Sequence, residues 1–178
     1  MLNDMKEVLI SEEKIADKVT ELATQISSDF NGEKLVVIGV LKGANVFVAD
    51  LIRKITIPIA LDFMAISSYG SSTESSGVVK ILKDLDEDIE GHNVLVVEDI
   101  IDTGLTLSYL SEYLKSRGAK TISICTLLDK PDRRKAHIDV RYKGFDIPDE
   151  FVVGYGIDFN EKYRNLPFVG ILKEEAYQ

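Results

Sequence analysis

A short run of polar residues follows an apolar strand pattern in residues 94–107, VLVVEDIIDTGLTL. The residues of this run that could carry chemistry are Glu98, Asp99, Asp102, Thr103, Gly104 and Thr106. Glycine permits a tight turn, consecutive N–H groups and threonine hydroxyls donate to an anion, and a following helix N-terminus adds positive potential. The carboxylates would repel a phosphate unless they bind hydroxyl groups, a metal ion or a proton. The segment therefore predicts a site for a sugar phosphate together with Mg²⁺.

The order of these residues resembles the phosphoribosyl-pyrophosphate motif of the type I phosphoribosyltransferases: two apolar residues, two acids, two apolar residues, then D-T-G-x-T. The resemblance implies that these residues bind phosphoribosyl pyrophosphate, the donor of the phosphoribosyl group. It implies that Glu98 and Asp99 bind the ribose hydroxyls and the metal, and that Asp102, in the same donor site, is the general base. It also implies a 5′-phosphate site made by Thr103, Gly104, Leu105 and Thr106. Some members carry a basic side chain in place of Leu105, so only its backbone is expected to contribute. The simpler alternative has solvated strand-end acids and a helix cap at Asp102.

Two further segments resemble the pyrophosphate side of the hypoxanthine-guanine phosphoribosyltransferases. In VLKGA, the resemblance implies that Lys42 and Gly43 bind pyrophosphate and that the Leu41–Lys42 peptide is cis. In DEFVVGYGIDFNEKYRNLP, it implies that Arg164 contacts pyrophosphate and that Asp158 reaches the metal from the same side. The alternatives are a solvent-facing turn lysine and a surface arginine.

The resemblance also covers recognition of a purine base. Lys130, in LLDKPDRRK, matches the family lysine that binds the exocyclic oxygen of the purine. Phe151 is expected to stack on the base, and Val152 is expected to offer backbone groups to it. Asp158 is expected to be the remaining purine-binding residue. The alternative places Phe151 and Val152 in the core of a strand.

The small polar residues that begin at Ser68 and Tyr69 resemble the family's mobile lid. Closing such a lid would exclude water from a reactive ribosyl centre. A flexible hairpin loop is the alternative.

Other charged and titratable residues have simpler interpretations. The charges of Arg133, Arg134 and Lys135 are expected to form a solvated surface. His92 and His137 lack metal-ligand spacing and are read as ordinary surface or strand-edge residues.

Composition narrows the class of protein. The chain has 178 residues, of which 45% are hydrophobic, and no linker or repeat divides it, so a single domain over residues 1–178 is expected. A formal net charge of -9 disfavours a nucleic-acid partner. Cys125 lies in an apolar run and is the single cysteine, so a reducing, cytoplasmic compartment is expected. No apolar run approaches the roughly 20 residues that cross a bilayer, so no membrane partner is expected.

The spacing of apolar residues predicts alternating helices and strands. Helices are expected over residues 11–30, with Ser11 as the N-cap, over 44–53, and around Leu107, Leu110 and Leu114. Strands are expected over 35–41, 57–67, 78–85, 93–100 and 121–128. This order predicts an α/β fold with a central, mostly parallel, twisted sheet flanked by helices. The resemblance adds a core over about 30–145 and a small hood made by the N-terminal segment and about 146–178.

The resemblance implies a magnesium-dependent pentosyl transferase of purine salvage. Such an enzyme converts hypoxanthine or guanine and 5-phosphoribosyl 1-pyrophosphate to IMP or GMP and pyrophosphate, and the family suggests a homodimer or homotetramer. One rival is a regulator that senses phosphoribosyl pyrophosphate without turnover. It is disfavoured because the chain is acidic and only about 30 residues precede the first expected strand. A transferase for pyrimidines or adenine fits the donor site but not residues 149–167.

Overall fold

The structure is a computed structural model that describes residues 1–68 and 79–177. Of the two residues expected to begin the lid, Ser68 ends a strand and Tyr69 lies outside the described residues. None of the helices in the described part is long and apolar enough to cross a membrane.

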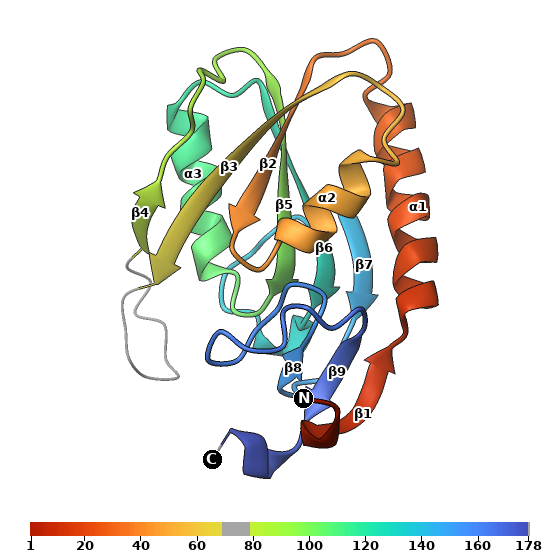
Figure 1. Cartoon of the computed structure of the whole chain (residues 1–178). Coiled ribbons are helices and arrows are strands. Elements are labelled where there is room, and N and C mark those ends of the chain that lie inside the picture. The colour runs from red at the N-terminus through yellow and green to blue at the C-terminus, as the bar shows by residue number, and fades with distance from the viewer. Residues whose placement is uncertain (69–78, 178) are drawn as a thin grey trace.

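Six strands form the main sheet in the order β4-β3-β2-β5-β6-β7. Their bounds are β2 Leu35–Leu41, β3 Ile59–Ser68, β4 Val79–Lys83, β5 Asn93–Ile101, β6 Thr121–Asp129 and β7 Tyr142–Asp146. All neighbouring strands are parallel except β3 and β4, which pair antiparallel. The expected fold class is therefore confirmed, and parallel order brings the carboxyl ends of β2, β5 and β6 to one edge (Figure 1).

Helices cover both faces of this sheet, which explains why its central strands are continuously apolar. Helices α1 (Glu12–Asp29) and α2 (Asn45–Ile52) pack on one face, and α3 (Leu105–Ser116) packs on the other (Figure 1). Alternate residues of β2 lie on the two faces of the sheet. Val37 lies in the core under α1 and α2, and Val36 and Ile38 lie in the core under α3.

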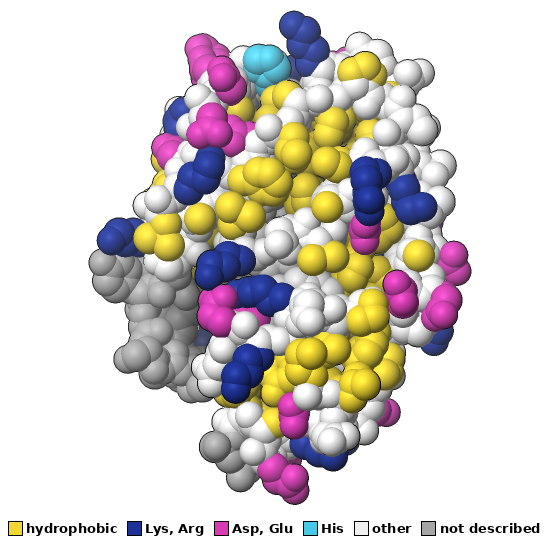
Figure 2. All heavy atoms as spheres, viewed as in Figure 1, with side chains coloured by type: hydrophobic (Ala, Val, Ile, Leu, Met, Phe, Trp, Pro, Cys, Tyr) yellow, Lys and Arg dark blue, Asp and Glu magenta, His cyan; other side chains and the backbone are white. Residues whose placement is uncertain are grey.

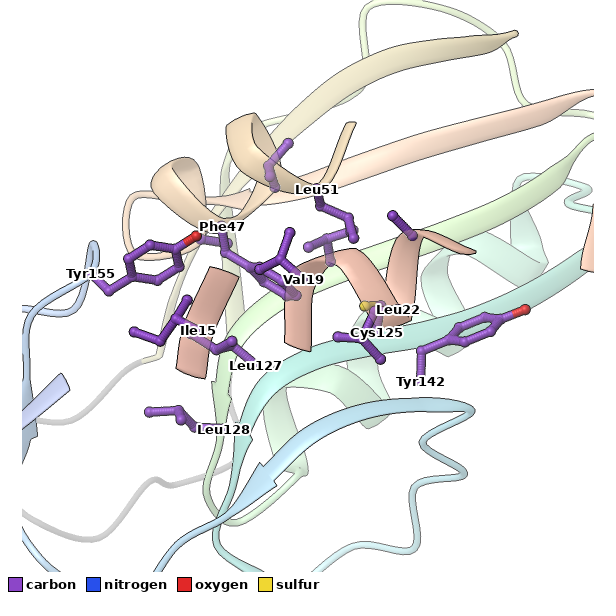
Figure 3. Close-up of a cluster of buried hydrophobic side chains, with 14 of the residues drawn as sticks. Ile15, Val19, Leu22, Phe47, Leu51, Cys125, Leu127, Leu128, Tyr142 and Tyr155 are labelled. Atoms are coloured by element: carbon purple, nitrogen blue, oxygen red, sulfur yellow. The ribbon is translucent and has the colours of Figure 1, made fainter. Parts of the chain in front are cut away.

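Helix α1 begins as its sequence predicts. The Ser11 hydroxyl accepts a hydrogen bond from the backbone N–H of Lys14 at 3.3 Å, which satisfies a free donor of the first turn. Its buried residues recur at helical spacing: Ile15, Val19, Leu22, Ala23 and Ile26. In Figure 3 the side chains of Ile15, Val19 and Leu22 meet labelled side chains of α2 and β6 between the helices and the sheet.

The two terminal segments form a second, three-stranded antiparallel sheet in the order β1-β9-β8. Its strands are β1 Met5–Ile10, β8 Val152–Val153 and β9 Val169–Leu172. Three 3-10 turns complete the described elements: Leu2–Asp4, Pro131–Arg133 and Glu174–Ala176.

Strand β1 corrects one expectation, because the first strand comes before α1 and not about 30 residues into the chain. Most of β1 is exposed, so it lacks the apolar run that marks the central strands. Its partner β9 lies at the other end of the sequence, where no local signal points to it.

Candidate active site

A cavity of about 270 Å³ opens at the carboxyl ends of β2 and β5, where open parallel sheets bind ligands. Leu41 and Gly43 line one side of it, and residues between Glu98 and Leu107 line the other. The lining includes every residue of the predicted sugar-phosphate site except Leu105.

Gly104 makes the turn that the phosphate site requires. Its φ of +80° is strained for a side-chain-bearing residue, and as the N-cap of α3 it has no side chain of its own to cap the helix. The N–H of Leu105 donates to the Thr103 hydroxyl in a long hydrogen bond of 3.4 Å. The next N–H groups of the first turn, at Thr106 and Leu107, have no intrahelical acceptor and are available to an anion. The carbonyl of Thr103 accepts hydrogen bonds from the N–H groups of Lys135 at 2.8 Å and Ala136 at 3.1 Å, so the segment after β6 holds this turn from outside.

Glu98 and Asp99 form a pair of partly buried carboxylates at the end of β5. The Asp99 carboxylate accepts a hydrogen bond from the N–H of Ile100 at 2.7 Å. Burial, with the neighbouring charge of Asp99, raises the pKa of Glu98 well above its usual range. Burial also raises the pKa of Asp99, against opposing hydrogen bonds and the charge of Arg164. Within the described ranges neither carboxylate has an ion-pair partner, so the pair favours a ligand that brings hydroxyl groups or positive charge.

The donor set fits Mg²⁺ only in part. Carboxylate oxygens are ligands that Mg²⁺ prefers, and burial, with the charge of Asp99 as a second cause at Glu98, raises the pKa of both carboxyl groups, so a cation would stabilise their ionised forms. Yet residues 1–68 and 79–177 hold no group of three or more His, Cys, Asp or Glu side chains placed to bind one metal, so Asp158 does not join Glu98 and Asp99 in such a group. A magnesium ion here would take most of its ligands from substrate and water, as this ion commonly does.

Close backbone packing joins the two sides of the cavity. The Leu41–Lys42 peptide is cis, as the resemblance implies. A Cβ atom on Gly43 would overlap the carboxylate of Asp99, and one on Gly156 would overlap the carbonyl oxygen of Gly43. Only glycine fits at either position, so the loop after β2 is held between β5 and the C-terminal segment.

The cations expected to bind pyrophosphate are paired with acids of the C-terminal segment. Arg164 donates to the carbonyl of Gly156 at 2.8 Å and forms an ion pair with Asp158 at 3.0 Å. Lys42 forms an exposed ion pair with Glu161 at 3.2 Å, and Glu161 also lies 3.4 Å from Arg164. Sequence reasoning missed Glu161, whose signal was an acid between Asp158 and Arg164 in DFNEKYR.

Lys130 lies at the end of β6 and is nearly buried, with 11% of its side chain exposed. Its ammonium group donates to the carbonyl of Glu150 at 2.7 Å and lies 3.5 Å from the carboxylate of Asp149. The lysine is therefore aimed at the segment that carries Phe151, and not at solvent.

Phe151 and Val152 differ in exposure although they are adjacent. Val152 is buried in β8, whereas Phe151 precedes that strand and keeps 39% of its surface exposed. The alternative that both residues lie in a strand core therefore holds for Val152 alone. Phe151 contacts two other aromatic rings, Phe159 and Tyr177.

The prediction that these charges form a solvated surface is wrong for Arg134 and only partly right for Arg133. Arg134 forms an ion pair with the buried carboxylate of Asp129. Arg133 is partly exposed, but its Nε donates to Asp102 Oδ1 at 3.0 Å and its Nη1 lies 3.6 Å from Asp149. The 3-10 turn Pro131–Arg133 places these side chains against the site, which a charge run alone does not reveal.

Comparison with known proteins defines the class. Residues 7–160 match the family model described as a phosphoribosyl transferase domain. The chain therefore belongs to the phosphoribosyltransferase family of enzymes.

Within this family, several relatives are hypoxanthine-guanine phosphoribosyltransferases. The chain is 55% identical to the hypoxanthine-guanine phosphoribosyltransferase of Bacillus subtilis, over 100% of this chain and 99% of that protein. It is 52% identical to the enzyme of that name from Mycobacterium tuberculosis, over 98% of this chain and 90% of that protein. A crystal structure of a Staphylococcus aureus hypoxanthine phosphoribosyltransferase aligns with a TM-score of 0.97 at 52% identity, over 100% of this chain and 97% of that one.

Proposed function

We propose that the chain transfers a phosphoribosyl group from 5-phosphoribosyl 1-pyrophosphate to hypoxanthine or guanine, in the presence of Mg²⁺. The products are IMP or GMP and pyrophosphate, and the role is purine salvage. The observation that carries this proposal is one cavity that contains the Glu98-to-Thr106 segment, with Lys130 following the neighbouring strand. The names of the relatives support the same reaction.

The donor binds across the turn between β5 and α3. Backbone N–H groups of the first turn of α3 and the hydroxyls of Thr103 and Thr106 hold the 5′-phosphate at the N-terminus of that helix, and the phosphate replaces Thr103 as the acceptor for the Leu105 N–H. Glu98 and Asp99 accept hydrogen bonds from the ribose hydroxyls, which offsets the loss of solvent contact that raises the pKa of both carboxyl groups.

Pyrophosphate lies on the opposite side of the cavity, near Lys42, Gly43 and Arg164. Both cations are paired with acids in the described structure. Pyrophosphate therefore displaces Glu161 from Lys42 and competes with Asp158 for Arg164. Mg²⁺, when bound, would neutralise part of the charge of the leaving group; Glu98 and Asp99 would face it from the ribose side and Asp158 from the pyrophosphate side, with substrate and water supplying most of its ligands.

The base lies between the donor and the segment around Phe151. Lys130 donates to the 6-oxo group, the ring of Phe151 stacks on the purine, and the backbone at Val152 completes the recognition. Asp102 accepts the proton of the purine imidazole ring as the nitrogen attacks the anomeric carbon. Arg133 donates only to Oδ1 of Asp102, so Oδ2 can accept the proton while this hydrogen bond is kept.

The direct test is to incubate the protein with phosphoribosyl pyrophosphate and Mg²⁺ and with hypoxanthine, guanine, xanthine or adenine separately. Chromatography should show nucleotide formation with hypoxanthine and guanine, with one pyrophosphate released per nucleotide. Tight binding of the donor without nucleotide formation from any base would instead favour the regulator.

We also propose a homodimer or homotetramer in the cytoplasm. Exposed apolar side chains on the edge half of the sheet support an oligomer: Leu61 on β3 is 43% exposed and Leu82 on β4 is 62% exposed. Figure 2 shows hydrophobic side chains gathered over this part of the molecule. Analytical ultracentrifugation would measure the oligomeric state.

The buried, unpaired thiol of Cys125 supports a reducing compartment.

A further inference from the structure

Tyr177, near the C-terminal end of the chain, stacks on Phe151. The two ring centroids lie 4.9 Å apart and the ring planes differ by 17°. A third ring, Phe159, meets Phe151 nearly at right angles, with centroids 5.2 Å apart. Three segments that are separate in sequence therefore meet at the side chain proposed to stack on the purine.

The backbone fixes Tyr177 in this place. The 3-10 turn Glu174–Ala176 follows β9 directly, and the Tyr177 N–H donates to the carbonyl of Glu174 at 3.1 Å. At the start of the turn, Lys173 donates from its backbone to Asp4 at 2.9 Å and from its side chain to Asn3 at 2.7 Å. The tyrosine also packs against a small buried cluster made by Val153, Tyr163, Leu166 and Leu172.

We propose that Tyr177 is a positioning residue for recognition of the base: it stacks on one face of Phe151 and leaves the exposed part of that side chain to the purine. This inference rests on the proposed function. Phe151 remains 39% exposed although two rings contact it, so part of its surface is free for a ligand.

A stack on one face restricts the rotation of the phenyl ring. An exposed phenylalanine without such a partner would lose more side-chain freedom when the purine binds. By holding the ring in one orientation, Tyr177 lowers that cost. The benefit concerns the base only, because the phosphate site lies on the turn before α3 and contains no part of this aromatic group.

The test compares four variants by steady-state kinetics with hypoxanthine and phosphoribosyl pyrophosphate as varied substrates. Tyr177→Ala removes the ring, Tyr177→Leu keeps apolar packing without an aromatic face, and Tyr177→Phe keeps the stack. Glu175→Ala is the control, because Glu175 is an exposed residue of the same turn. Melting temperatures of all variants establish that they are folded.

We expect Tyr177→Ala and Tyr177→Leu to raise the KM for hypoxanthine about two- to tenfold, the range expected from loss of one stacked pair. The KM for the donor and kcat should stay within about twofold, and Tyr177→Phe and Glu175→Ala should resemble the wild type.

Three results would overturn the role of Tyr177. An unchanged KM for hypoxanthine in both Tyr177→Ala and Tyr177→Leu would show that the stack does not serve the base. A lower KM would show that Tyr177 covers the face that the base needs, and an equal rise for both substrates would indicate a general structural effect. Absence of turnover in the wild type would instead overturn the proposed function on which this role rests.

Discussion

Arg133 donates from its Nε to Asp102 Oδ1 at 3.0 Å, so the proposed general base is hydrogen-bonded to a cation in the described structure. The two side chains are partly exposed, at 40% for Arg133 and 45% for Asp102. Ion pairs this exposed contribute little to stability, because water and salt screen them. The contact therefore orients the Asp102 carboxylate only weakly and leaves its second oxygen, Oδ2, to accept a proton.

Asp102→Asn should keep donor binding but slow nucleotide formation about 100- to 10,000-fold, because an amide cannot accept the proton. Arg133→Gln should change kcat/KM by no more than about fivefold, because an exposed pair is worth at most about 1 kcal/mol. Single-turnover rates, measured so that product release does not mask the chemical step, would check both. A near-normal rate for Asp102→Asn would remove Asp102 from the role of base.

Removal of the metal should stop turnover. Excess chelator should abolish nucleotide formation and added Mg²⁺ should restore it, because pyrophosphate would otherwise lie close to the carboxylates of Glu98 and Asp99. Turnover that persists undiminished in chelator would contradict this arrangement.

Asp158→Ala should act on the leaving-group side of the site. Because Asp158 pairs with Arg164 at 3.0 Å, its loss should change the rate of pyrophosphate release more than the KM for hypoxanthine. Rapid-quench measurements separate the two steps. A change confined to the KM for the base would place Asp158 on the purine side instead.

Lys130→Gln should narrow the preference for 6-oxopurines over adenine. An ammonium group only donates, so it pairs with a carbonyl oxygen but not with the amino group of adenine, and a buried mismatch of this kind can discriminate about 10,000-fold. Glutamine offers either a donor or an acceptor. The measurement is kcat/KM for hypoxanthine, guanine and adenine in both proteins, with Lys135→Gln, an exposed lysine, as the control. Unchanged selectivity would mean that Lys130 does not read the base.

Glu98→Gln should stabilise the ligand-free, metal-free protein at alkaline pH. Burial, with the charge of Asp99, raises the pKa of Glu98 well above its usual 4.5, so the folded state retains a proton that the unfolded chain has lost. The free energy of unfolding therefore falls as the pH rises from about 4.5 through the folded-state pKa. Glutamine does not ionise and avoids this loss.

Thermal unfolding in chelator should thus give a higher Tm for Glu98→Gln than for the wild type at about pH 8, with the difference shrinking toward about pH 5. Glu112→Gln, which alters an exposed carboxylate on α3, is the matched control and should show no such trend. A pH-independent difference would contradict the proposed cause.

The sequence by itself determined the central strands and the turn that carries the site. Strands β2, β5 and β6 agree with the predicted ranges to within one residue, because a strand covered on both faces is a continuous apolar run. The turn at Gly104 was also predictable, because a glycine directly before a helical pattern indicates a tight turn, and the observed φ of +80° is one that favours glycine. Such signals are encoded within about ten neighbouring residues.

Only the tertiary structure decided which distant residues meet. The pairing of β1 with β9, the contact of Arg133 with Asp102, the link from Glu161 to Lys42 and the stack of Tyr177 on Phe151 have no local signature. The contact of Arg133 with Asp102 depends on the pairing of β5 with β6. The other three contacts depend on how the terminal segments return to the edge of the parallel sheet. Apolar periodicity fixes which face of an element is buried, but it does not fix which charged or aromatic side chain stands opposite.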